Sequence, residues 1–536
     1  MTLIKNGFII DGTGAPGFTG SIVVDGDRIA EVIKHDASSP PHSALSTPHS
    51  ALHVGETCFD DVIDAQGAII APGFIDAHTH SDAYLVLEPG APSKITQGIT
   101  TEINGQCGGS VAPRYGEARL SSDWAALLGD RLTWRSLAEY REVLEAAKPA
   151  VNTVQFIGHN TLRSSVIGYR GVAASPDDMR EMTRLLEKSL DEGGWGLTTG
   201  LIYQPGKYST PEEVVALAKT TAARGGFYAT HMRSEGDRLL EAVDEVIDLV
   251  KETGIKAEIS HLKTSGKKNW HKIDALLEKM NGAIDSGVLL GSDRYPFTAA
   301  GTDLDVVFPD WAGEGGCPAE CARLADPATR ARIVAEIDAS GRDWSTVMIG
   351  GTWHPETKQF SGRYVSEAKG GLSAGEFICR VLELDGCKTG GFFFGMSEAN
   401  LDRILSQNWI VPGSDASLRA PWGPLSADHP HPRAYATMPE FYRRVRALGF
   451  SREETIARMT GVIAKRFEIP RRGTLERGNF ADIVVFREDD FKIRSTFADP
   501  HRFTTGVELV MVNGAIPYRA GEFTSTRSGR FLERRA

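Results

Sequence analysis

Two histidines, His78 and His80, follow an apolar run that ends near Gly73. Alternate residues of a strand point to the same side, so both imidazoles are predicted to face one way at the end of a buried strand. Neutral imidazole is the commonest metal ligand, and two of them at the carboxyl end of a barrel strand suit a metal centre. A bare His-x-His motif also occurs as an ordinary polar strand end, so the remaining chain must decide between the two.

Further residues of metal-binding type stand at or just past the ends of later β-patterned segments. They are Cys107, His159, His231, His261 and Asp415. A barrel takes its catalytic groups from such strand ends. Imidazole, thiolate and carboxylate are together the ligands of zinc or a similar borderline metal. Each residue alone is unremarkable, but their joint placement predicts a metal centre.

The elements that position these residues alternate between β and α patterns. Strand-like runs are predicted at 73–80, 100–105, 153–159, 194–199, 226–231, 255–261, 287–295 and 409–415. Boundary signals separate them, among them Thr210-Pro-Glu-Glu213, which is typical of a capping box with proline in the first helical turn. Repeated β–α units imply a parallel sheet, and eight of them imply a closed (β/α)8 TIM-type barrel. The predicted fold class is therefore α/β.

The chain ends and one internal stretch depart from this alternation. Residues 1–72 and 466–536 carry short strands and turns, and we predict that the last strands pair with the first in a small β-sandwich domain. The catalytic barrel is then expected at 73–465. About 110 residues separate the seventh and eighth strands, more than one loop needs, so 305–390 is predicted to be an inserted subdomain.

Two local features complete the pass along the chain. Pro41-His-Ser-Ala-Leu45 recurs as Pro48-His-Ser-Ala-Leu52, and this small duplication within 36–60 predicts a loop. Cys317 and Cys321 lie in the predicted insert, where ordinary thiols are expected in preference to a second zinc site.

Composition narrows the functional classes. The chain has 536 residues, a net charge of -11 and six scattered cysteines. Its length predicts more than one core, and its charge argues against a nucleic-acid or anionic-membrane partner. No apolar run approaches the ~20 residues of a membrane span, and the start of the chain lacks a signal peptide's apolar core. We expect a cytoplasmic protein with a small-molecule substrate, and the oligomeric state stays open.

Several segments resemble the amidohydrolase superfamily, and within it the N-acyl-D-amino-acid deacylase (D-aminoacylase) family. The resemblance covers nearly the whole chain. Residues 71–80 are generic to the superfamily, whereas the segment 100–113 around Cys107 and His429-Pro-His-Pro-Arg433 are specific to the family. The other resembling segments are 158–163, 230–235, 259–263, 295–298 and 413–415.

The resemblance implies a zinc-dependent (β/α)8 barrel beside a β-sandwich. Most binuclear relatives bridge their metals with a carboxylated lysine from the fourth strand, but Gly196-Leu-Thr-Thr-Gly200 carries no lysine. The resemblance implies Cys107 in that role, since a soft thiolate holds zinc strongly. The implied tight site consists of Cys107, His231 and His261, and the implied second site, weaker or empty, consists of His78, His80 and Asp415.

The implied reaction is hydrolysis of the amide bond of an N-acyl-D-amino acid to a carboxylate and the free D-amino acid. Zinc would lower the pKa of bound water from about 15.7 towards about 7. Asp415 would act as the general base that takes the water's proton and returns it to the leaving amine. The alternative for Asp415 is an N-cap after the eighth strand, because Ser-Asp is a good cap.

Substrate binding requires a group for the carboxylate of the amino acid. Arg433 is the candidate, because guanidinium binds carboxylate bidentately, although Gly301 stands where the family has a serine. Members specific for acidic side chains use another arginine soon after the Tyr-Pro stretch, and 302–308 has none. A neutral or hydrophobic side chain is therefore expected. The predicted substrate-binding residues are Lys263, Tyr295, Arg433, His159 and Tyr203.

Other functions are also possible for the same residues. N-acyl-D-glutamate or N-acyl-D-aspartate deacylation would use the same barrel, and so would hydrolysis of a cyclic amide such as a hydantoin, which the missing strand-four lysine disfavours. A hydrolase with Cys107 as nucleophile would be insensitive to chelators. A metal-free assembly scaffold would have lost its ligands, whereas this chain has kept every one.

Overall fold

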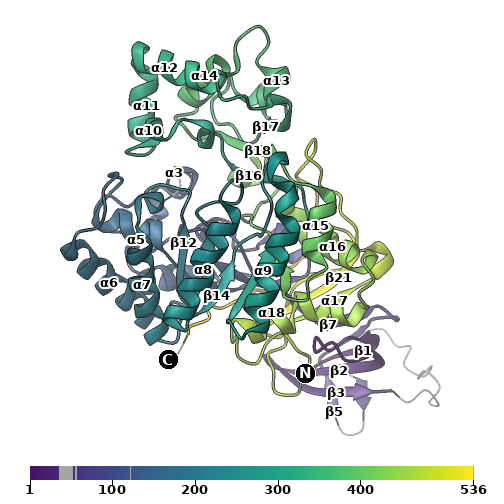
Figure 1. The fold of residues 1–536 in the computed structure, drawn as a ribbon. Coiled ribbons are helices and arrows are strands. Elements are labelled where there is room, and N and C mark those ends of the chain that lie inside the picture. Colours follow the sequence, from purple (N-terminus) through teal and green to yellow (C-terminus); the bar gives the residue numbers. More distant parts are fainter. Residues whose placement is uncertain (36–51, 55–56, 121, 535–536) are drawn as a thin grey trace.

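The computed structural model describes residues 1–35, 52–54, 57–120 and 122–534. Three regions follow one another from bottom to top in Figure 1: a β-rich base, a central body in which helices surround strands, and an upper part that is mostly helical. Both chain ends lie low in this view. Of the stretch 36–60, which was predicted to be a loop, residues 36–51 and 55–56 lie outside the described residues, whereas 52–54 and 57–59 are paired strands.

The central body is the predicted parallel barrel. Its strands pair in chain order, and hydrogen bonds join the last to the first: the Ala77 amide donates to the Pro412 carbonyl oxygen at 3.2 Å, and Thr79 bridges Ala416 in parallel. The strands are β8 (Phe74–Asp76), β9 (Ile99–Asn104), β10 (Asn152–Gln155) continued by β11 (Ile157–Gly158), β12 (Gly196–Gly200), β13 (Phe227–His231), β14 (Lys256–Ile259), β15 (Leu290–Arg294) and β19 (Ile410–Pro412).

The third strand differs from its prediction. It breaks at Phe156, and His159 is the first residue of a helix instead of the last residue of the strand. Gly158 explains the change, because a Cβ there would lie 2.3 Å from the Gly108 carbonyl oxygen. The same oxygen accepts the Asn160 amide at 2.9 Å. The turn after β9 therefore presses against the chain here and starts the helix.

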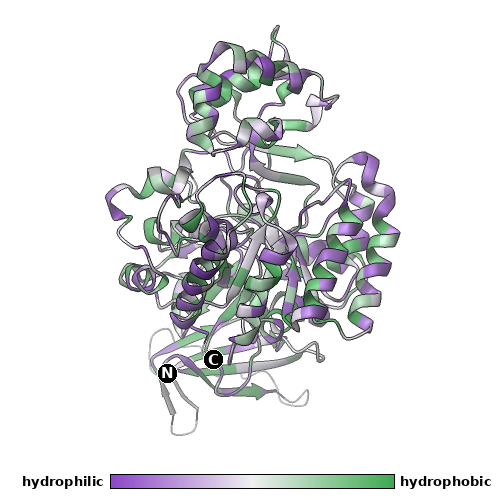
Figure 2. Ribbon diagram, turned by 60° about the vertical axis from the view of Figure 1, so that its left-hand side comes forward, coloured by the Kyte–Doolittle hydropathy of each residue, from purple (hydrophilic) through white to green (hydrophobic). Residues whose placement is uncertain are grey.

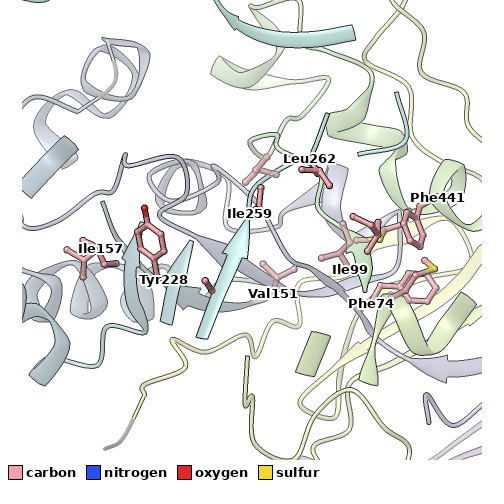
Figure 3. Packing of buried hydrophobic residues seen from close by; sticks show 14 of the residues in the cluster. Phe74, Ile99, Val151, Ile157, Tyr228, Ile259, Leu262 and Phe441 are labelled. Carbon is pink, nitrogen blue, oxygen red and sulfur yellow. The ribbon is translucent and has the colours of Figure 1, made fainter. Parts of the chain in front are cut away.

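Helices cover the outside of the barrel with their apolar faces inward. Figure 2 shows many of them divided lengthwise into hydrophilic and hydrophobic strips. In Figure 3, Phe74, Ile99 and Phe441 gather beside one group of strands, and Tyr228 and Ile157 beside another. Burial of these faces is the main favourable contribution to folding. The helices of this region are α1 (Tyr84–Leu87), α2 (Pro92–Ile95), α3 (Ser122–Leu128), α4 (Leu137–Ala147), α5 (His159–Val166), α6 (Pro176–Asp191), α7 (Pro211–Ala223), α8 (Leu239–Thr253), α9 (Ile273–Asp285), α15 (Glu398–Leu405), α16 (Arg433–Ala447), α17 (Arg452–Met459) and α18 (Gly461–Arg466).

The base joins strands from both chain ends, as expected. Residues 69–72 pair antiparallel with residues 483–486, so the late strands extend the sheet of the early ones. These strands are connected by hydrogen bonds into one sheet, and side chains from its early and late strands, such as Ile22 and Leu509, share one buried core as in the predicted sandwich. They are β1 (Thr2–Ile9), β2 (Phe18–Asp25), β3 (Arg28–Lys34), β6 (Asp61–Asp64), β7 (Ile69–Pro72), β20 (Ile483–Phe486), β21 (Val507–Val512), β22 (Ala515–Arg519) and β23 (Glu522–Phe523), and β4 (Leu52–Val54) pairs separately with β5 (Thr57–Phe59).

The upper part lies between β15 and β19, where the insert was predicted. It contains its own antiparallel sheet besides helices, and a separate buried core that includes Leu304, Ile333 and Ile378. Cys321 Sγ lies 3.6 Å from Cys387 Sγ in this core, and both thiols are free. The elements are β16 (Ala299–Asp303), α10 (Asp310–Gly313), α11 (Cys317–Ala325), α12 (Pro327–Asp338), β17 (Val347–Ile349), α13 (Val365–Ala368), α14 (Ala374–Leu384) and β18 (Gly390–Phe394). No helix among the described residues is long and apolar enough to span a membrane.

Candidate metal centre

Predicted ligands from four parts of the chain meet at one end of the barrel. Cys107 Sγ lies 3.3 Å from His78 Nε2 and 3.4 Å from His261 Nε2. Asp415 Oδ1 lies 3.4 Å from His78 Nε2 and 3.0 Å from His80 Nε2. One ligand atom each of His78, Cys107, His261 and Asp415 falls within 4.8 Å of the others. The structure thus brings these side chains together, and their role as metal ligands stays a prediction.

The backbone is unusual at three of these positions. Cys107, His261 and Asp415 have φ values of 51°, 38° and 49°. Residues other than glycine rarely adopt this left-handed backbone conformation, and each instance costs on the order of 1–3 kcal/mol. Such strain persists where surrounding contacts over-determine it, and it clusters at functional sites. All three residues stand just past the strands that carry them, so the turns aim their side chains at one point.

His231 completes the group from β13. Its ring lies edge-on to that of His261, with 4.6 Å between centroids. Both of its ring nitrogens are buried and have no hydrogen-bond partner within the described part of the chain, since the Glu235 Oε2 atom beside Nε2 is 3.6 Å away. A buried polar atom without a partner is costly. The unpartnered His231 nitrogens are therefore a specific indication that a further group belongs beside this ring.

The charges of the cluster also fit a cation. Burial by itself would raise the pKa of the Cys107 thiol, but the charges of His78 and His261 hold it well below its usual value. Burial and Lys263 would lower the pKa of His261, but the charges of Glu235, Asp415 and Cys107 raise it to about 10. Buried negative charge thus raises the pKa of His78, His80 and His261 despite their burial, and a divalent metal would compensate the same charge. Imidazole, thiolate and carboxylate are the donors zinc prefers.

Asp293, which we did not single out from the sequence, supports two of these histidines. Its Oδ2 lies 3.1 Å from His78 Nδ1, and its Oδ1 accepts the His261 amide at 3.0 Å. A carboxylate on the far nitrogen of a ligand histidine orients the ring and sets its tautomer. The sequence contained one indication of this role, because an acidic residue stands inside a strand that is buried throughout.

Lys94 holds the turn that carries Asp415. Its ammonium is fully buried and donates to Asp76 Oδ2 at 3.0 Å, Ser414 Oγ at 3.1 Å and the Ala416 carbonyl oxygen at 3.0 Å. The Asp415 amide itself donates to the His78 carbonyl oxygen at 2.8 Å. Among the described residues, no helix begins at Asp415 and its carboxylate faces the cluster, so the N-cap alternative is wrong.

A cationic group of predicted substrate-binding residues lies next to the cluster. Arg433 Nη1 is 2.8 Å from Asp415 Oδ2, and Nη2 donates to the Gly301 carbonyl oxygen at 3.1 Å. The guanidinium carbon lies 4.6 Å from the centre of the Tyr295 ring, and the Lys263 ammonium lies 5.8 Å from it. The Tyr295 hydroxyl is buried and has no hydrogen-bond partner among the described residues. The guanidinium of Arg433 and the ammonium of Lys263 therefore both lie near the ring of Tyr295, whose hydroxyl is a free donor among the described residues.

Arg294 is a second residue that sequence reasoning missed. Its guanidinium carbon lies 4.0 Å from the centre of the Tyr295 ring, and its Nη2 donates to the Phe297 carbonyl oxygen at 2.8 Å. Its Nε and Nη1 are buried without a hydrogen-bond partner in the described part of the chain. The sequence-based expectation concerned an arginine after the Tyr-Pro stretch, and Arg294 stands directly before it.

The two remaining candidates lie in different surroundings. The Tyr203 ring packs edge-on against His231, 4.9 Å between centroids, so it borders the cluster. His159 instead pairs through Nε2 with Glu213 Oε1 at 2.8 Å, an oxygen that Arg163 also contacts at 3.0 Å. The structure does not bring His159 into the cluster.

Glu213 was expected to complete a capping box, but its carboxylate pairs with His159 and Arg163 instead, and only the Thr210 hydroxyl caps the helix.

Comparisons with known proteins agree with this arrangement. Residues 61–518 match the amidohydrolase family. The chain is 32% identical over 540 residues to an N-acyl-D-glutamate deacylase of Alcaligenes xylosoxydans xylosoxydans, covering 100% of this chain and 96% of that protein. It is 31% identical to a D-aminoacylase of the same organism, covering 100% and 98%.

A solved structure is also similar over the full length. It is an N-acyl-D-glutamate deacylase from Bordetella bronchiseptica complexed with zinc and a phosphonate inhibitor. It superposes with a TM-score of 0.80 at 29% identity and covers 99% of each chain. The chain therefore belongs to the amidohydrolase family, and it is a hydrolase.

Cys107→Ala is expected to weaken zinc binding strongly, because it removes the only sulfur among the converging donors and leaves the histidines without a negative partner. Metal content after dialysis, and the zinc dissociation constant by chelator competition, measure the change. The matched control is Cys379→Ala, which removes a buried thiol of the upper core. Full zinc occupancy in the Cys107 variant would contradict the ligand role.

Proposed function

We propose that this chain hydrolyses the amide bond of N-acyl-D-amino acids with the help of zinc. The observation that carries the proposal is the placement of a thiolate, imidazole and carboxylate cluster beside the cationic group of Lys263, Tyr295 and Arg433. The first group suits a metal, and the second suits a substrate carboxylate. The preference for the D form rests on the relatives, two of which are named for D-amino acids.

Cys107, His231 and His261 would hold one zinc tightly, with a second, weaker site at His78, His80 and Asp415. The Cys107 sulfur contacts His261 of the first proposed site and His78 of the second, which supports a position of the thiolate between the two sites. When bound, zinc polarises the scissile amide and makes water acidic enough to react near neutral pH. The remaining chemistry belongs to the side chains.

Asp415 is proposed as the general base. Burial would raise the pKa of its carboxyl, but the charges of Arg433 and His261 and hydrogen bonds from His78 and His80 hold it well below the usual value. It is therefore a carboxylate that can accept a proton. Its contact with Arg433 also suggests an order of events: a substrate carboxylate competes for that guanidinium, and the Asp415 carboxylate then loses a cation and becomes a stronger base.

The substrate carboxylate is proposed to lie between Arg433, Lys263 and the Tyr295 hydroxyl. A guanidinium and an ammonium supply charge-assisted hydrogen bonds, and the phenol supplies a neutral donor. Gly301 has no side chain to contact Arg433, and its backbone carbonyl oxygen accepts a hydrogen bond from the guanidinium instead. Tyr203 is proposed to border the reacting amide, from its packing on His231. His159 does not lie in this group, because it pairs with Glu213, and its part is limited to beginning helix α5.

The favoured substrate is an N-acyl-D-amino acid with a neutral or hydrophobic side chain. The rings of Phe297, Phe392 and Phe497 pack around His431, with centroids 5.5, 5.4 and 4.8 Å away. A Cβ on Gly301 would lie 3.4 Å from Phe392 and 3.5 Å from Arg433, so this aromatic surface adjoins the carboxylate group. Apolar surface of this kind favours an apolar side chain over a charged one.

A second candidate is deacylation of an N-acylated D-glutamate or D-aspartate. Arg294 favours it, because its two unpartnered N–H groups could receive a second carboxylate. Hydrolysis of a cyclic amide is not favoured, because β12 carries no lysine.

The experiment that tests the proposal is an activity panel with zinc-loaded protein. It contains N-acetyl-D-leucine, N-acetyl-D-glutamate, both L forms and a hydantoin, with and without a chelator. We expect the highest kcat/KM for the D-leucine derivative and loss of activity with the chelator. A preference for D-glutamate would establish the second candidate, hydrolysis of the hydantoin alone would contradict deacylation, and chelator-resistant activity would favour a cysteine nucleophile.

Asp415→Asn is expected to lower kcat by about 100-fold or more, because general base catalysis contributes on the order of 10²–10⁴-fold. The amide keeps the size of the carboxylate but cannot take up the proton. Turnover of N-acetyl-D-leucine is measured together with zinc content, which should persist through Cys107, His231 and His261. Near-normal kcat in the zinc-loaded variant would remove Asp415 as the base.

Arg433→Ala is expected to raise KM about 10- to 100-fold, since a charge-assisted hydrogen bond contributes about 1.5–3 kcal/mol. The comparison is between an N-acyl-D-amino acid and its amide, which lacks the negative charge. The amide should bind poorly to the unaltered enzyme and lose little more in the variant. Equal losses for both substrates would show that Arg433 does not bind the carboxylate.

A further inference from the structure

A carboxylate outside the predicted ligand set lies behind two of the proposed zinc ligands. Glu235 follows β13, four residues after His231, and its side chain is 13% exposed. We infer that Glu235 is the positioning residue of the metal centre: it orients the rings of His231 and His261 and connects them to Lys263. The inference rests on the proposed zinc site and adds a residue that acts through its neighbours.

The contact with His261 defines the orientation of that ring. His261 Nδ1 lies 2.9 Å from Glu235 Oε1, and the opposite nitrogen, Nε2, lies 3.4 Å from Cys107 Sγ. With the proton on Nδ1, this nitrogen donates to the Glu235 carboxylate, and the neighbouring Lys263 ammonium donates to the same carboxylate and not to the ring. The lone pair of Nε2 is then available on the side of the ring that faces the cysteine, which is the side a metal would use.

His231 meets the other oxygen of the same carboxylate. Its Nε2 lies 3.6 Å from Glu235 Oε2, while its Nδ1 is buried with no hydrogen-bond partner among the described residues. Both histidines thus direct one nitrogen at Glu235. The two rings are nearly perpendicular, at 78°, and their centroids lie 4.6 Å apart, so that one carboxylate lies beside a nitrogen of each.

Glu235 itself is not proposed as a ligand. Ligand atoms of His231, Glu235 and His261 lie within 4.8 Å of one another, which alone would allow a cation between them. However, the Lys263 ammonium already occupies this position: it forms an ion pair with Glu235 Oε1 and lies 2.8 Å from His261 Nδ1. A metal here would have to displace a paired, buried ammonium, so the metal position lies on the Cys107 side of the rings.

The contact with Lys263 gives Glu235 a second consequence. One carboxylate orients two metal-binding rings and also holds the ammonium proposed to bind the substrate carboxylate. Removing its charge should therefore weaken zinc binding and substrate binding together. Residues behind metal ligands typically change metal affinity or activity by about 10–100-fold when they are mutated.

The test is the zinc dissociation constant of Glu235→Gln, measured by competition with a chromophoric chelator and requiring no substrate. We expect an increase of about 10- to 100-fold. The matched control is Glu213→Gln, another buried carboxylate that pairs with one histidine and one cation, His159 and Arg163, away from the cluster. It should keep the zinc affinity of the unaltered protein. An unchanged zinc affinity in folded Glu235→Gln overturns the inference.

Two additions keep the result decisive. If Glu235→Gln does not fold, Glu235→Asp retains the charge but withdraws it by one methylene: weaker zinc binding supports the inference and unaltered binding overturns it. In zinc-saturated Glu235→Gln, KM for a free-carboxylate substrate should rise more than for its amide, which a general loss of stability would not produce. Protein that binds zinc normally but hydrolyses no acylated amino acid contradicts the proposed function alone, because the zinc comparison remains valid.

Discussion

Negative charge buried in a small volume is the constraint on which this active end of the barrel depends. The Cys107 thiolate and the carboxylates of Asp293, Asp415 and Glu235 all lie in or against one cluster of histidines. Burying such charges is costly unless each is paired and hydrogen-bonded. Lys263 and Arg433 compensate part of the charge from the substrate side. A divalent metal at the cysteine would compensate much of the rest.

The backbone around the cluster has adapted to this requirement. Left-handed conformations, which cost energy in isolation, occur at Cys107, His261 and Asp415. The contacts that offset this cost come from deeper in the barrel, where Lys94 ties together Asp76 and the turn at 414–416. The Lys94 ammonium also lies 3.1 Å from Glu102 Oε1, so it has four oxygen partners and all of its protons are used. The precise placement of the ligands therefore depends on side chains that never reach the substrate.

The upper region contributes to the substrate side of the site and not to the metal side. β16 supplies the Gly301 carbonyl that holds Arg433, and the Thr302 hydroxyl lies 3.4 Å from that of Tyr203. β18 supplies Phe392 beside the same arginine. The barrel strands and the turns after them thus carry the cluster of thiolate, imidazole and carboxylate groups, and the insert contacts Arg433 and Tyr203 beside it.

The sequence by itself determined the order of the strands and the types of residue at their ends, because both follow from local periodicity and composition. For that reason His78, Cys107, His261 and Asp415 could be named together before any coordinates. Only the tertiary structure decided that Glu235 and Asp293 stand behind the histidines, that Arg294 stacks on Tyr295, and that His159 turns away to Glu213. These contacts join residues far apart in the chain or depend on side-chain direction. A close approach such as that of Gly158 to Gly108, which ends the third strand early, leaves no periodic trace in the sequence.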